Sequence, residues 1–283
     1  GVFASYSDPQ LDDVKITNCS SNLGSAIYVS NSSSSDTIRI SNCLFTDNTA
    51  GYNDGTIHAT SGILRIESTV VSENSSGGGI FSNGLESLTI VNSSIVNNAN
   101  YMGVMLQTGT NKIINSIISG NDSTQLRILN SADLTVEYCN VDGGEEGVLI
   151  ENDAVLNWSN GNIDVSPMFA DTANGNYHLL ASSQLINAGH PDSTDSDGTR
   201  ADIGVYPYLN SYSGPTWYVN TEGSDTEGTG SSESPFASVQ SAINFATTTG
   251  DSVTVSAGTY VENVNFRGRN IKVVGEDRET TII

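Results

Sequence analysis

Basic side chains recur at one position of a repeated segment, and this column is the first candidate for binding chemistry. Residues 1–165 hold only five Lys or Arg residues, and four of them occupy the middle of short segments with apolar, polar, apolar alternation. These middle positions are Lys15, Arg39, Arg65, Thr89, Lys112 and Thr135. Cationic side chains bind carboxylates through charge-assisted hydrogen bonds. Contact with a polyanionic sugar chain is therefore one hypothesis for the column, and an ordinary outward strand face is the other.

A second column combines aromatic, apolar and basic side chains. It is taken from the middle of a second alternating segment in each repeat, and its members are Phe3, Tyr28, His58, Phe81, Met105, Arg127 and Leu149. Aromatic and apolar groups exposed in a line can stack on sugar rings or bury against a partner. A strand face covered by a neighbouring loop is the alternative. The candidate carbohydrate-binding residues of the two columns are Lys15, Arg39, Arg65, Lys112, Tyr28, His58, Phe81 and Arg127.

The segment "DSTDSDGTRAD" (192–202) is the best candidate for a metal site. Its middle part matches the D-x-[DN]-x-[DN]-G pattern of calcium-binding loops. The match is partial, because Ser193 stands at the first ligand position and Gly204 at the twelfth. A structural Ca²⁺ ion is therefore one hypothesis, and a turn rich in Asp and Gly is the alternative. The candidate calcium ligands are Asp192, Asp195, Asp197 and Asp202.

No set of residues in the sequence predicts a catalytic site. A lyase that removes the C5 proton of a uronate needs a basic side chain, and calcium or another group to neutralise the carboxylate. Arg39 or Arg65 could supply the base, but no cluster of carboxylates shares their column. The histidines lack nucleophile or metal spacing, and no G-x-S-x-G element is present. We therefore predict no catalytic residues, and expect a polysaccharide lyase-like activity if the protein is an enzyme.

These residues must be positioned by a repeating architecture. Segments such as "IRISNCLFTDN", "LRIESTVVSEN" and "LTIVNSSIVNN" recur about every 24 residues, a period typical of solenoids. Their alternation indicates strands rather than helices. The fold expected is an all-β, right-handed, single-stranded parallel β-helix of the pectin-lyase-like kind. In such a stack, equivalent residues of successive coils lie over one another.

The predicted stacking places small and polar residues in ladders. We expect one ladder of Asn18, Asn42, Asn92 and Asn115, and another of Asn48, Asn74, Asn98 and Asn121. Cys19 and Cys43 are assigned to one interior column together with Cys139, Thr69, Ser93 and Ser116. A disulfide between Cys19 and Cys43 is the alternative to a free, buried small residue.

The charge of the chain excludes some partners. Acidic residues outnumber basic ones 32 to 10, which gives a net charge of −22. Such a charge repels nucleic acid and anionic lipid. No stretch is apolar enough over the length that spans a membrane. The opening residues "GVFAS" match the middle of a repeat, so we expect the chain to be an excerpt of a longer protein.

The stretch from Val165 to Tyr208 carries a family resemblance. The pieces "SPMFAD", "NYHLLASSQLINAGHPD" and "DGTRADIGVY" resemble the C-terminal region of bacterial secreted β-helix proteins called choice-of-anchor Q domain proteins. Upstream, "ISNCLFTDN" and "IVNSSIVNN" resemble the repeats of that family. The resemblance implies the pectin-lyase-like fold and export to the cell surface or medium. It implies no particular activity.

A second solenoid is expected to begin near the C-terminus. "YVNTEGSDTEGTG", "SPFASVQSAINFA" and "VSAGTYVENV" resemble the start of another pectate-lyase-like β-helix. A short helix is expected within 235–247, with "DSVTVSAGTY" as the first strand and "IKVVG" as the next. The predicted parts are coils over 1–164, a cap over 165–209, a linker over 210–216, and the second start over 217–283.

Two classes of function remain from the sequence. The first is a non-catalytic module, extracellular or on the bacterial outer surface, that serves adhesion or contact with a polysaccharide or cell-surface glycan. The second is a lyase, epimerase or hydrolase acting on uronate-rich polysaccharide such as pectate or alginate. Because solenoids of this kind host both, the fold does not separate them. The sequence does not set the oligomeric state.

Overall fold

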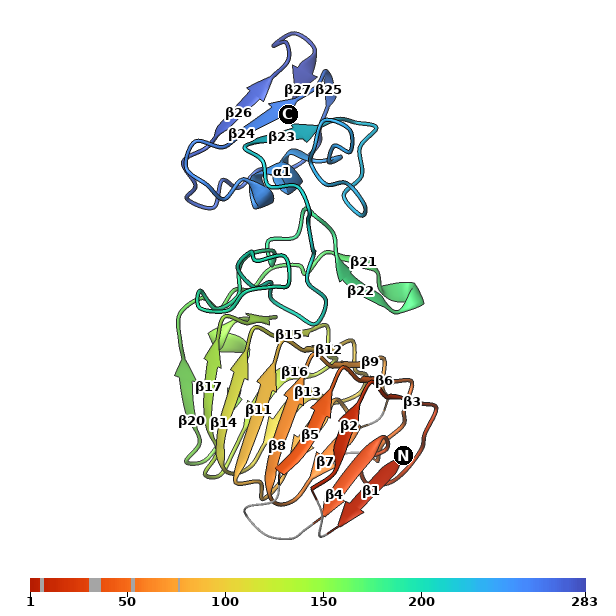
Figure 1. Cartoon of the computed structure of the whole chain (residues 1–283). Coiled ribbons are helices and arrows are strands. Elements are labelled where there is room, and N and C mark those ends of the chain that lie inside the picture. The colour runs from red at the N-terminus through yellow and green to blue at the C-terminus, as the bar shows by residue number, and fades with distance from the viewer. Residues whose placement is uncertain (6–7, 31–36, 52–53, 76) are drawn as a thin grey trace. The chain divides into compact units, whose positions relative to one another are not determined.

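The structure is a computed structural model that describes residues 1–5, 8–30, 37–51, 54–75 and 77–283. The chain forms two compact units (Figure 1). The first comprises Gly1–Val165 and Ile203–Val205, and the second comprises Ser166–Asp202 and Tyr206–Ile283. The stretch expected to form a cap thus lies mainly in the second unit. The domain boundaries derived from the sequence stay predictions.

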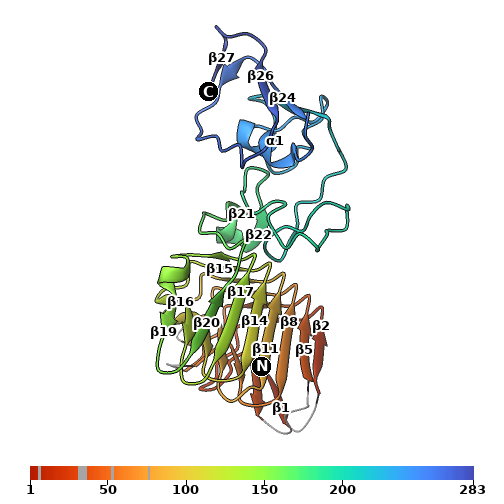
Figure 2. The same ribbon diagram turned by 90° about the vertical axis from the view of Figure 1, so that its left-hand side faces the viewer.

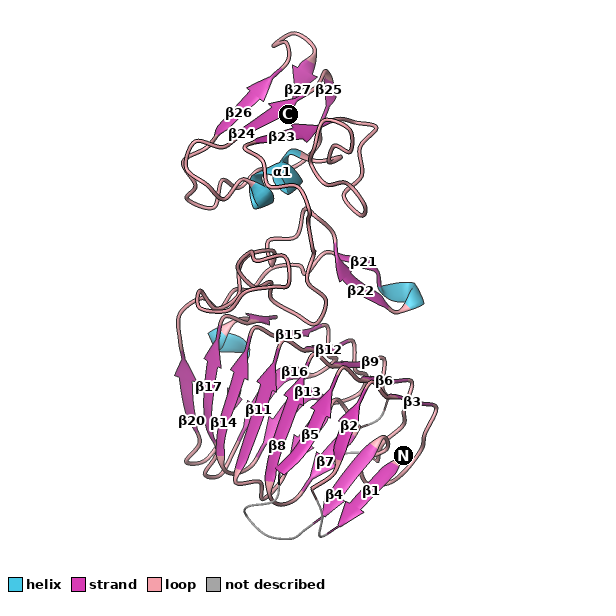
Figure 3. Cartoon of the chain, viewed as in Figure 1, coloured by secondary structure: helices cyan, strands magenta, loops and turns pink. Residues whose placement is uncertain are grey.

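The first unit consists of three parallel sheets, here called A, B and C (Figure 3). Sheet A contains β1 (Val2–Ser5), β4 (Ile27–Ser30), β7 (Ile57–Ala59), β10 (Ile80–Ser82), β13 (Met102–Leu106), β16 (Thr124–Ile128) and β19 (Leu149–Ile150). Sheet B contains β2 (Gln10–Asp12), β5 (Thr37–Ser41), β8 (Ile63–Glu67), β11 (Ser87–Val91), β14 (Thr110–Ile114), β17 (Asp133–Glu137) and β20 (Val155–Trp158). Sheet C contains β3 (Lys15–Thr17), β6 (Leu44–Thr46), β9 (Val70–Ser72), β12 (Ser94–Val96), β15 (Ile117–Ser119) and β18 (Asn140–Val141).

Successive coils each contribute one strand to every sheet. Neighbouring strands in each sheet are three elements apart along the chain, as in the order β1-β4-β7 of sheet A. Figure 2 shows the strands of sheet B side by side in the order β2-β5-β8-β11-β14-β17-β20. In sheet B, Ile40 pairs with Ile66 and Ile66 pairs with Ile90, and these side chains are at most 1% exposed. The predicted all-β parallel β-helix, with equivalent side chains stacked in its interior, is confirmed.

The first coil is not aligned as the sequence predicted. Lys15 lies in β3 of sheet C, where it pairs with Leu44, and Gln10 is the residue that pairs with Arg39 in sheet B. Placing Lys15 in the basic column was wrong, because strands of sheets B and C share the same alternation and "VKI" fits both. In the first two coils, paired residues such as Asp12 and Ser41 are 29 residues apart. The alignment made from the sequence assumed a repeat of about 24 residues and therefore missed this longer offset.

One asparagine ladder is confirmed in full. The Nδ2 group of Asn48 donates to Oδ1 of Asn74 over 3.1 Å, and the same bond joins Asn74 to Asn98 and Asn98 to Asn121 over 2.9 Å. Each amide also donates to a backbone carbonyl of the preceding coil, as Asn98 does to Val71 over 2.9 Å. The ladder satisfies polar groups that are almost fully buried, which unpaired would destabilise the fold.

The other predicted asparagine ladder is wrong. Asn42, Asn92 and Asn115 share one turn position with φ between 46° and 52°, and the amide of Asn42 donates to Asp12 instead of an equivalent asparagine. These residues occur there because asparagine tolerates the left-handed region better than most residues. Asn18, with φ 55°, precedes Cys19, whose N–H donates to Asn48, so it belongs to a different turn.

The three cysteines are free thiols. The backbone N–H of Cys43 donates to Oγ1 of Thr69 over 3.3 Å, within the predicted column of small residues. Cys19 instead lies at the start of the confirmed asparagine ladder, so assigning it to the column of Cys43 was wrong. Burial raises the pKa of the Cys139 thiol to about 12, which disfavours the reactive thiolate.

The second unit combines a hairpin with the start of another parallel stack. Its strands are β21 (Phe169–Asp171) and β22 (Asn176–Leu179), which are antiparallel, and the parallel sets β23 (Thr216–Val219), β24 (Ser252–Val255) and β26 (Lys272–Gly275), and β25 (Gly258–Thr259) and β27 (Thr281–Ile282). The predicted strands at 252–255 and 272–275 are present, but the stack begins one strand earlier, with β23.

A short helix packs against the first strands of this stack. The expected helix forms only over α1 (Val239–Phe245), and it contacts β23 and β24. Ser238 caps its N-terminus by accepting from Ser241, and the Glu262 carboxylate accepts from the first two helical N–H groups, each over 2.8 Å. Its predicted apolar residues are fully buried, namely Val239, Ala242, Ile243 and the adjoining Ala246. Two 3₁₀ turns, at Glu145–Gly147 and Thr172–Asn174, complete the elements.

Replacing Asn98 by alanine is expected to destabilise the first unit strongly. The change leaves polar groups of Asn74 and Val71 without their bonds in the interior, at about 1–3 kcal/mol for each buried group left unpaired. The matched control is Asn157→Ala, whose exposed amide donates to Asp133. Chemical denaturation should show a large loss for the first variant and a small loss for the second. Equal losses would contradict a stabilising role for the ladder.

Candidate functional site

The aromatic column on sheet A is aligned in the structure as predicted. Parallel pairing places Phe3 beside Tyr28, Tyr28 beside His58, and so on through the column to Leu149. The first four rings are in contact. The ring centroids of Phe3 and Tyr28 are 5.6 Å apart in a stacked pair, Tyr28 and His58 are 5.1 Å apart, and His58 and Phe81 are 4.7 Å apart.

Only part of this column is accessible. Phe3 is 67% exposed and Tyr28 half-buried, whereas His58 and Phe81 are 6% and 8% exposed. Phe81 packs in a small apolar cluster with Met102 and Met105, with Tyr101 and Leu129 against it. The predicted alternative, a strand face covered by neighbouring residues, therefore describes the middle of the column. The stacked pair of Phe3 and Tyr28 remains as an open aromatic surface.

A cleft of about 310 Å³ adjoins the open pair. Its lining residues are Gly1, Val2, Phe3, Ser20, Ser21, Leu23, Gly24, Ser25 and Tyr28. Aromatic faces with hydroxyl groups beside them combine an apolar contact with hydrogen-bonding capacity. This arrangement can hold a small, polar and uncharged ring.

His58 is held by a buried carboxylate that the sequence analysis did not single out. Its Nδ1 atom is 2.5 Å from Oδ1 of Asp54, which precedes it by four residues. Asp54 also accepts from the backbone N–H groups of Gly24 and Gly55. Because both side chains are buried and His58 lies between two rings, the pair orients the imidazole within the aromatic column. The "DGTIH" spacing was the available signal.

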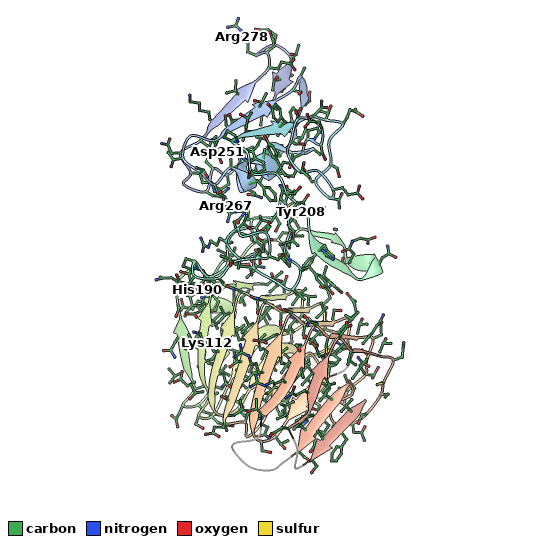
Figure 4. All side chains as sticks on the ribbon, viewed as in Figure 1. Lys112, His190, Tyr208, Asp251, Arg267 and Arg278 are labelled. Atoms are coloured by element: carbon green, nitrogen blue, oxygen red, sulfur yellow. The ribbon has the colours of Figure 1, made fainter. Side chains whose placement is uncertain are left out.

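The basic column of sheet B is largely neutralised by carboxylates. Arg65 forms an ion pair with Glu67, and Nζ of Lys112 is 2.5 Å from Oε1 of Glu137; Figure 4 labels Lys112 on this sheet. Arg39 is exposed and follows the column in register with Arg65. With Lys15 on another sheet and two of its remaining cations paired, the column offers little net charge to a polyanion.

Arg127, which precedes Leu149 in the sheet A column, forms an ion pair with Glu151. Its Nε donates to Oε2 of Glu151 over 2.5 Å, and its Nη1 donates to the Tyr101 hydroxyl over 3.3 Å. The hydrogen bond that Arg127 donates to Glu151 is the main cause that raises the pKa of Arg127. Its guanidinium is thus engaged with neighbouring side chains of the coil.

The aspartates proposed as calcium ligands accept hydrogen bonds within their loop. Asp195 accepts from the N–H of Asp202, and Asp202 accepts from Asn187 and Tyr208, each over 2.7 Å. Asp197 accepts from Thr199 and Asn210, and the N–H of Asp192 donates to His190. Among the residues that the structure describes, no three or more His, Cys, Asp or Glu side chains gather as around a metal ion. Calcium binding stays a prediction.

Burial and hydrogen bonding shift the pKa values of these carboxyl groups in different directions. Burial raises the pKa of Asp202 to about 7, although its two N–H donors act in the opposite direction. Burial likewise raises the pKa of Asp195. At Asp197 burial acts in the same sense, but the bonds from Thr199 and Asn210 outweigh it, and the pKa is lowered.

The comparison with known families agrees with this architecture. A family model described as the right-handed beta helix region matches residues 25–183, more than half of the chain. The chain belongs to the right-handed β-helix family. No curated protein and no solved structure matches this right-handed β-helix protein significantly. Membership of this family confirms the right-handed winding predicted from the sequence. The fold alone does not determine the function, which has to be inferred from the surface residues.

No helix of this β-helix protein is both long enough and apolar enough to cross a membrane, over all the residues described above.

An arginine group in the second unit, like Asp54, was not predicted from the sequence. The signal for it was "RGR" at 267–269, which places two cations close together in a chain with few of them.

Asp202 is expected to make the second unit less stable as the pH rises from about 4 to about 7. A carboxyl whose pKa is raised on folding binds its proton more tightly in the folded state over this window, so the folding free energy weakens as the proton leaves. Asp202→Asn should reduce this slope, and the raised pKa of Asp195 should leave part of it. Asp197→Asn should retain most of the slope, because the lowered pKa of Asp197 gives a stabilisation that is lost only as the pH falls below about 4.

The test is denaturation at several pH values, followed by Trp217 fluorescence in a Trp158→Phe background. An unchanged slope between pH 4 and 7 in Asp202→Asn, or a larger loss of slope in Asp197→Asn than in Asp202→Asn, would contradict these pKa shifts.

Proposed function

We propose that the protein is a non-catalytic β-helix module of the cell surface or medium that contacts polysaccharide through the aromatic end of sheet A. The observation that carries the proposal is the open, stacked pair of Phe3 and Tyr28 beside a cleft of about 310 Å³ lined with serines. Both rings line the cleft, and they stack on each other with an interplanar angle of 21°. Sugar rings bind by laying their apolar face on an exposed aromatic ring.

The electrostatics support a neutral glycan over a polyanionic one. The chain has a net charge of −22, and Arg65 and Lys112, which were candidates for gripping an acidic sugar, are paired with carboxylates. An acidic polymer would have to displace these ion pairs while approaching a negatively charged protein. Neutral hexose or pentose chains meet no such barrier.

The geometry of the basic side chains also supports a binding role over lyase chemistry. A general base must lie within hydrogen-bond reach of the proton that it removes. Arg65 and Lys112 have their charged groups directed to Glu67 and Glu137, and His58 is buried between rings. Arg39 is the basic residue of this face that the structure leaves exposed.

The proposed location rests on the resemblance of residues 165–208 to choice-of-anchor Q domain proteins. Family membership supports only the coarser statement that the chain is a right-handed β-helix. Export is consistent with the abundance of Asn, Ser, Thr and Gly and the scarcity of lysine. Adhesion through a rigid solenoid surface is the role that we infer for the module at the cell exterior.

Tyr28→Ala is expected to weaken glycan binding at least about tenfold, because it removes one of the two aromatic rings that line the cleft. The experiment is a glycan array followed by calorimetry with the best neutral oligosaccharide. Tyr28→Phe should retain most of the affinity. The matched control is Leu149→Ala, at the far end of the same column and 42% exposed, which should bind as the unchanged protein does.

Two outcomes would overturn the proposal. One is a Tyr28→Ala variant that binds the glycan with unchanged affinity. The other is the formation of unsaturated uronate, detected by ultraviolet absorbance on pectate or alginate, with loss of that product in Arg39→Ala. The latter would establish the lyase activity as the function.

A further inference from the structure

Three of the ten basic residues of the chain gather in the second unit, at Arg200, Arg267 and Arg269. Burial lowers the pKa of Arg269 to about 10, and repulsion from Arg267 and then Arg200 adds to this effect. Burial also lowers the pKa of Arg267, with repulsion from Arg200 as the next cause. In a chain with 32 acidic residues, a cluster of like positive charges requires an explanation.

Backbone carbonyls hold these guanidinium groups in place. Arg269 donates to the carbonyls of Ile243 and Asn244 at the C-terminus of α1. Arg267 donates to the Ile186 carbonyl over 2.9 Å, and Nε of Arg200 donates to the Gly189 carbonyl over 2.6 Å. Neutral acceptors orient the groups without cancelling their charge.

Carboxylates do not neutralise the two buried members. Within the described parts of the chain, neither Arg267 nor Arg269 forms an ion pair. Asp251 and Asp202 act on them only through longer-range attraction, and the raised pKa of Asp202 reduces its negative charge near neutral pH. The guanidinium groups of Arg267 and Arg269 each have five N–H donors, and their bonds to carbonyls occupy only some of them.

A cleft opens beside the cluster. It measures about 430 Å³, and its lining residues are Asn187, Gly198, Thr199, Arg200, Thr247 and Arg269. Its lining residues include two arginines, an asparagine and two threonines. Guanidinium, amide and hydroxyl groups can donate hydrogen bonds, as a site for an anion requires. The Thr199 hydroxyl already donates to Asp197, which leaves Arg200, Arg269, Asn187 and Thr247 as donors.

The helix-capping role of Arg269 explains only one member of the cluster. A cation near the last carbonyls of a helix is stabilising in itself. Arg200 donates to the carbonyls of Gly189 and Ala188, outside α1, and lines the same cleft. Bringing a second guanidinium to this place adds repulsion, which a bound anion would relieve.

We propose that the cleft lined by Arg200 and Arg269 binds a small oxyanion, either inorganic sulfate or phosphate or the carboxylate of a sugar acid. Arg200 and Arg269 would hold the oxygens, Arg267 adds positive potential from behind, and Thr247 and Asn187 supply neutral hydrogen bonds. This site is separate from the aromatic surface on sheet A and does not depend on the proposed glycan contact.

The experiment measures binding of sodium sulfate, sodium phosphate and sodium glucuronate by calorimetry and by thermal shift, against sodium chloride at equal ionic strength. Saturable binding of at least one oxyanion, with a rise in melting temperature, is expected. Sulfate or phosphate binding without glucuronate binding identifies an inorganic ligand. Tighter binding of glucuronate identifies a sugar acid.

Arg200→Gln should reduce the affinity at least tenfold, and Thr247→Val several-fold, while both variants keep the circular dichroism spectrum of the unchanged protein. Arg278→Gln is the matched control, because it removes one positive charge from a side chain that is 91% exposed. Figure 4 labels Arg278 at the tip of the second unit, away from Arg267. The absence of saturable binding to all three oxyanions, or equal affinity in Arg200→Gln and Arg278→Gln, would overturn the proposal.

Discussion

The fold depends on the register in which each coil lies on the next. When equivalent residues of successive coils are in contact, the interior becomes columns of like side chains, such as Ile40, Ile66 and Ile90. The same register brings the amides of Asn74 and Asn98 within 2.9 Å. A shift of one residue would turn the apolar set outward and break every bond of the ladder at once, so the ladder and the apolar core fix the register together.

The outer surface follows from this constraint. Rings that occupy one position of sheet A must touch across coils, as Tyr28 and His58 do. Charges that occupy one position of sheet B must repel unless carboxylates separate them, as Glu67 does for Arg65. Stacking therefore creates both a surface for ligands and a need for neutralisation. The stacked pair of Phe3 and Tyr28 belongs to this outer surface, whereas the arginine cleft lies in the irregular part of the second unit.

Much of the fold could be predicted from the sequence because its signals repeat. The alternation of apolar and polar residues predicted most strand positions. The regular spacing of Asn48, Asn74 and Asn98 predicted one asparagine ladder. The first coil could not be predicted in the same way. Its "VKI" segment suits sheet B and sheet C equally, and only the three-dimensional pairing of Gln10 with Arg39 decides between them. The prediction of the second ladder was wrong because asparagine recurs for two different reasons. It suits turn positions with positive φ, and it also forms side-chain hydrogen bonds between coils.

The candidate site was less predictable, because contacts across coils determine it. The alignment of the aromatic column was correct, but the covering of Phe81 by Tyr101 and Leu129 depends on side chains that no periodicity relates. The pairing of Lys112 with Glu137 is likewise a contact between neighbouring coils. Arg200 and Arg269 are 69 residues apart in an irregular region, and only folding reveals that they share one cleft.

Disulfide trapping tests the register most directly. Gln10→Cys combined with Arg39→Cys places two cysteines on paired residues of adjacent strands, whereas Lys15→Cys combined with Arg39→Cys places them on different sheets. Disulfides form only when the two Cα atoms lie within about 7 Å. The account predicts that mild oxidation followed by peptide mass mapping finds the cross-link in the first variant and not in the second. A cross-link that forms in the Lys15 variant and not in the Gln10 variant would contradict it.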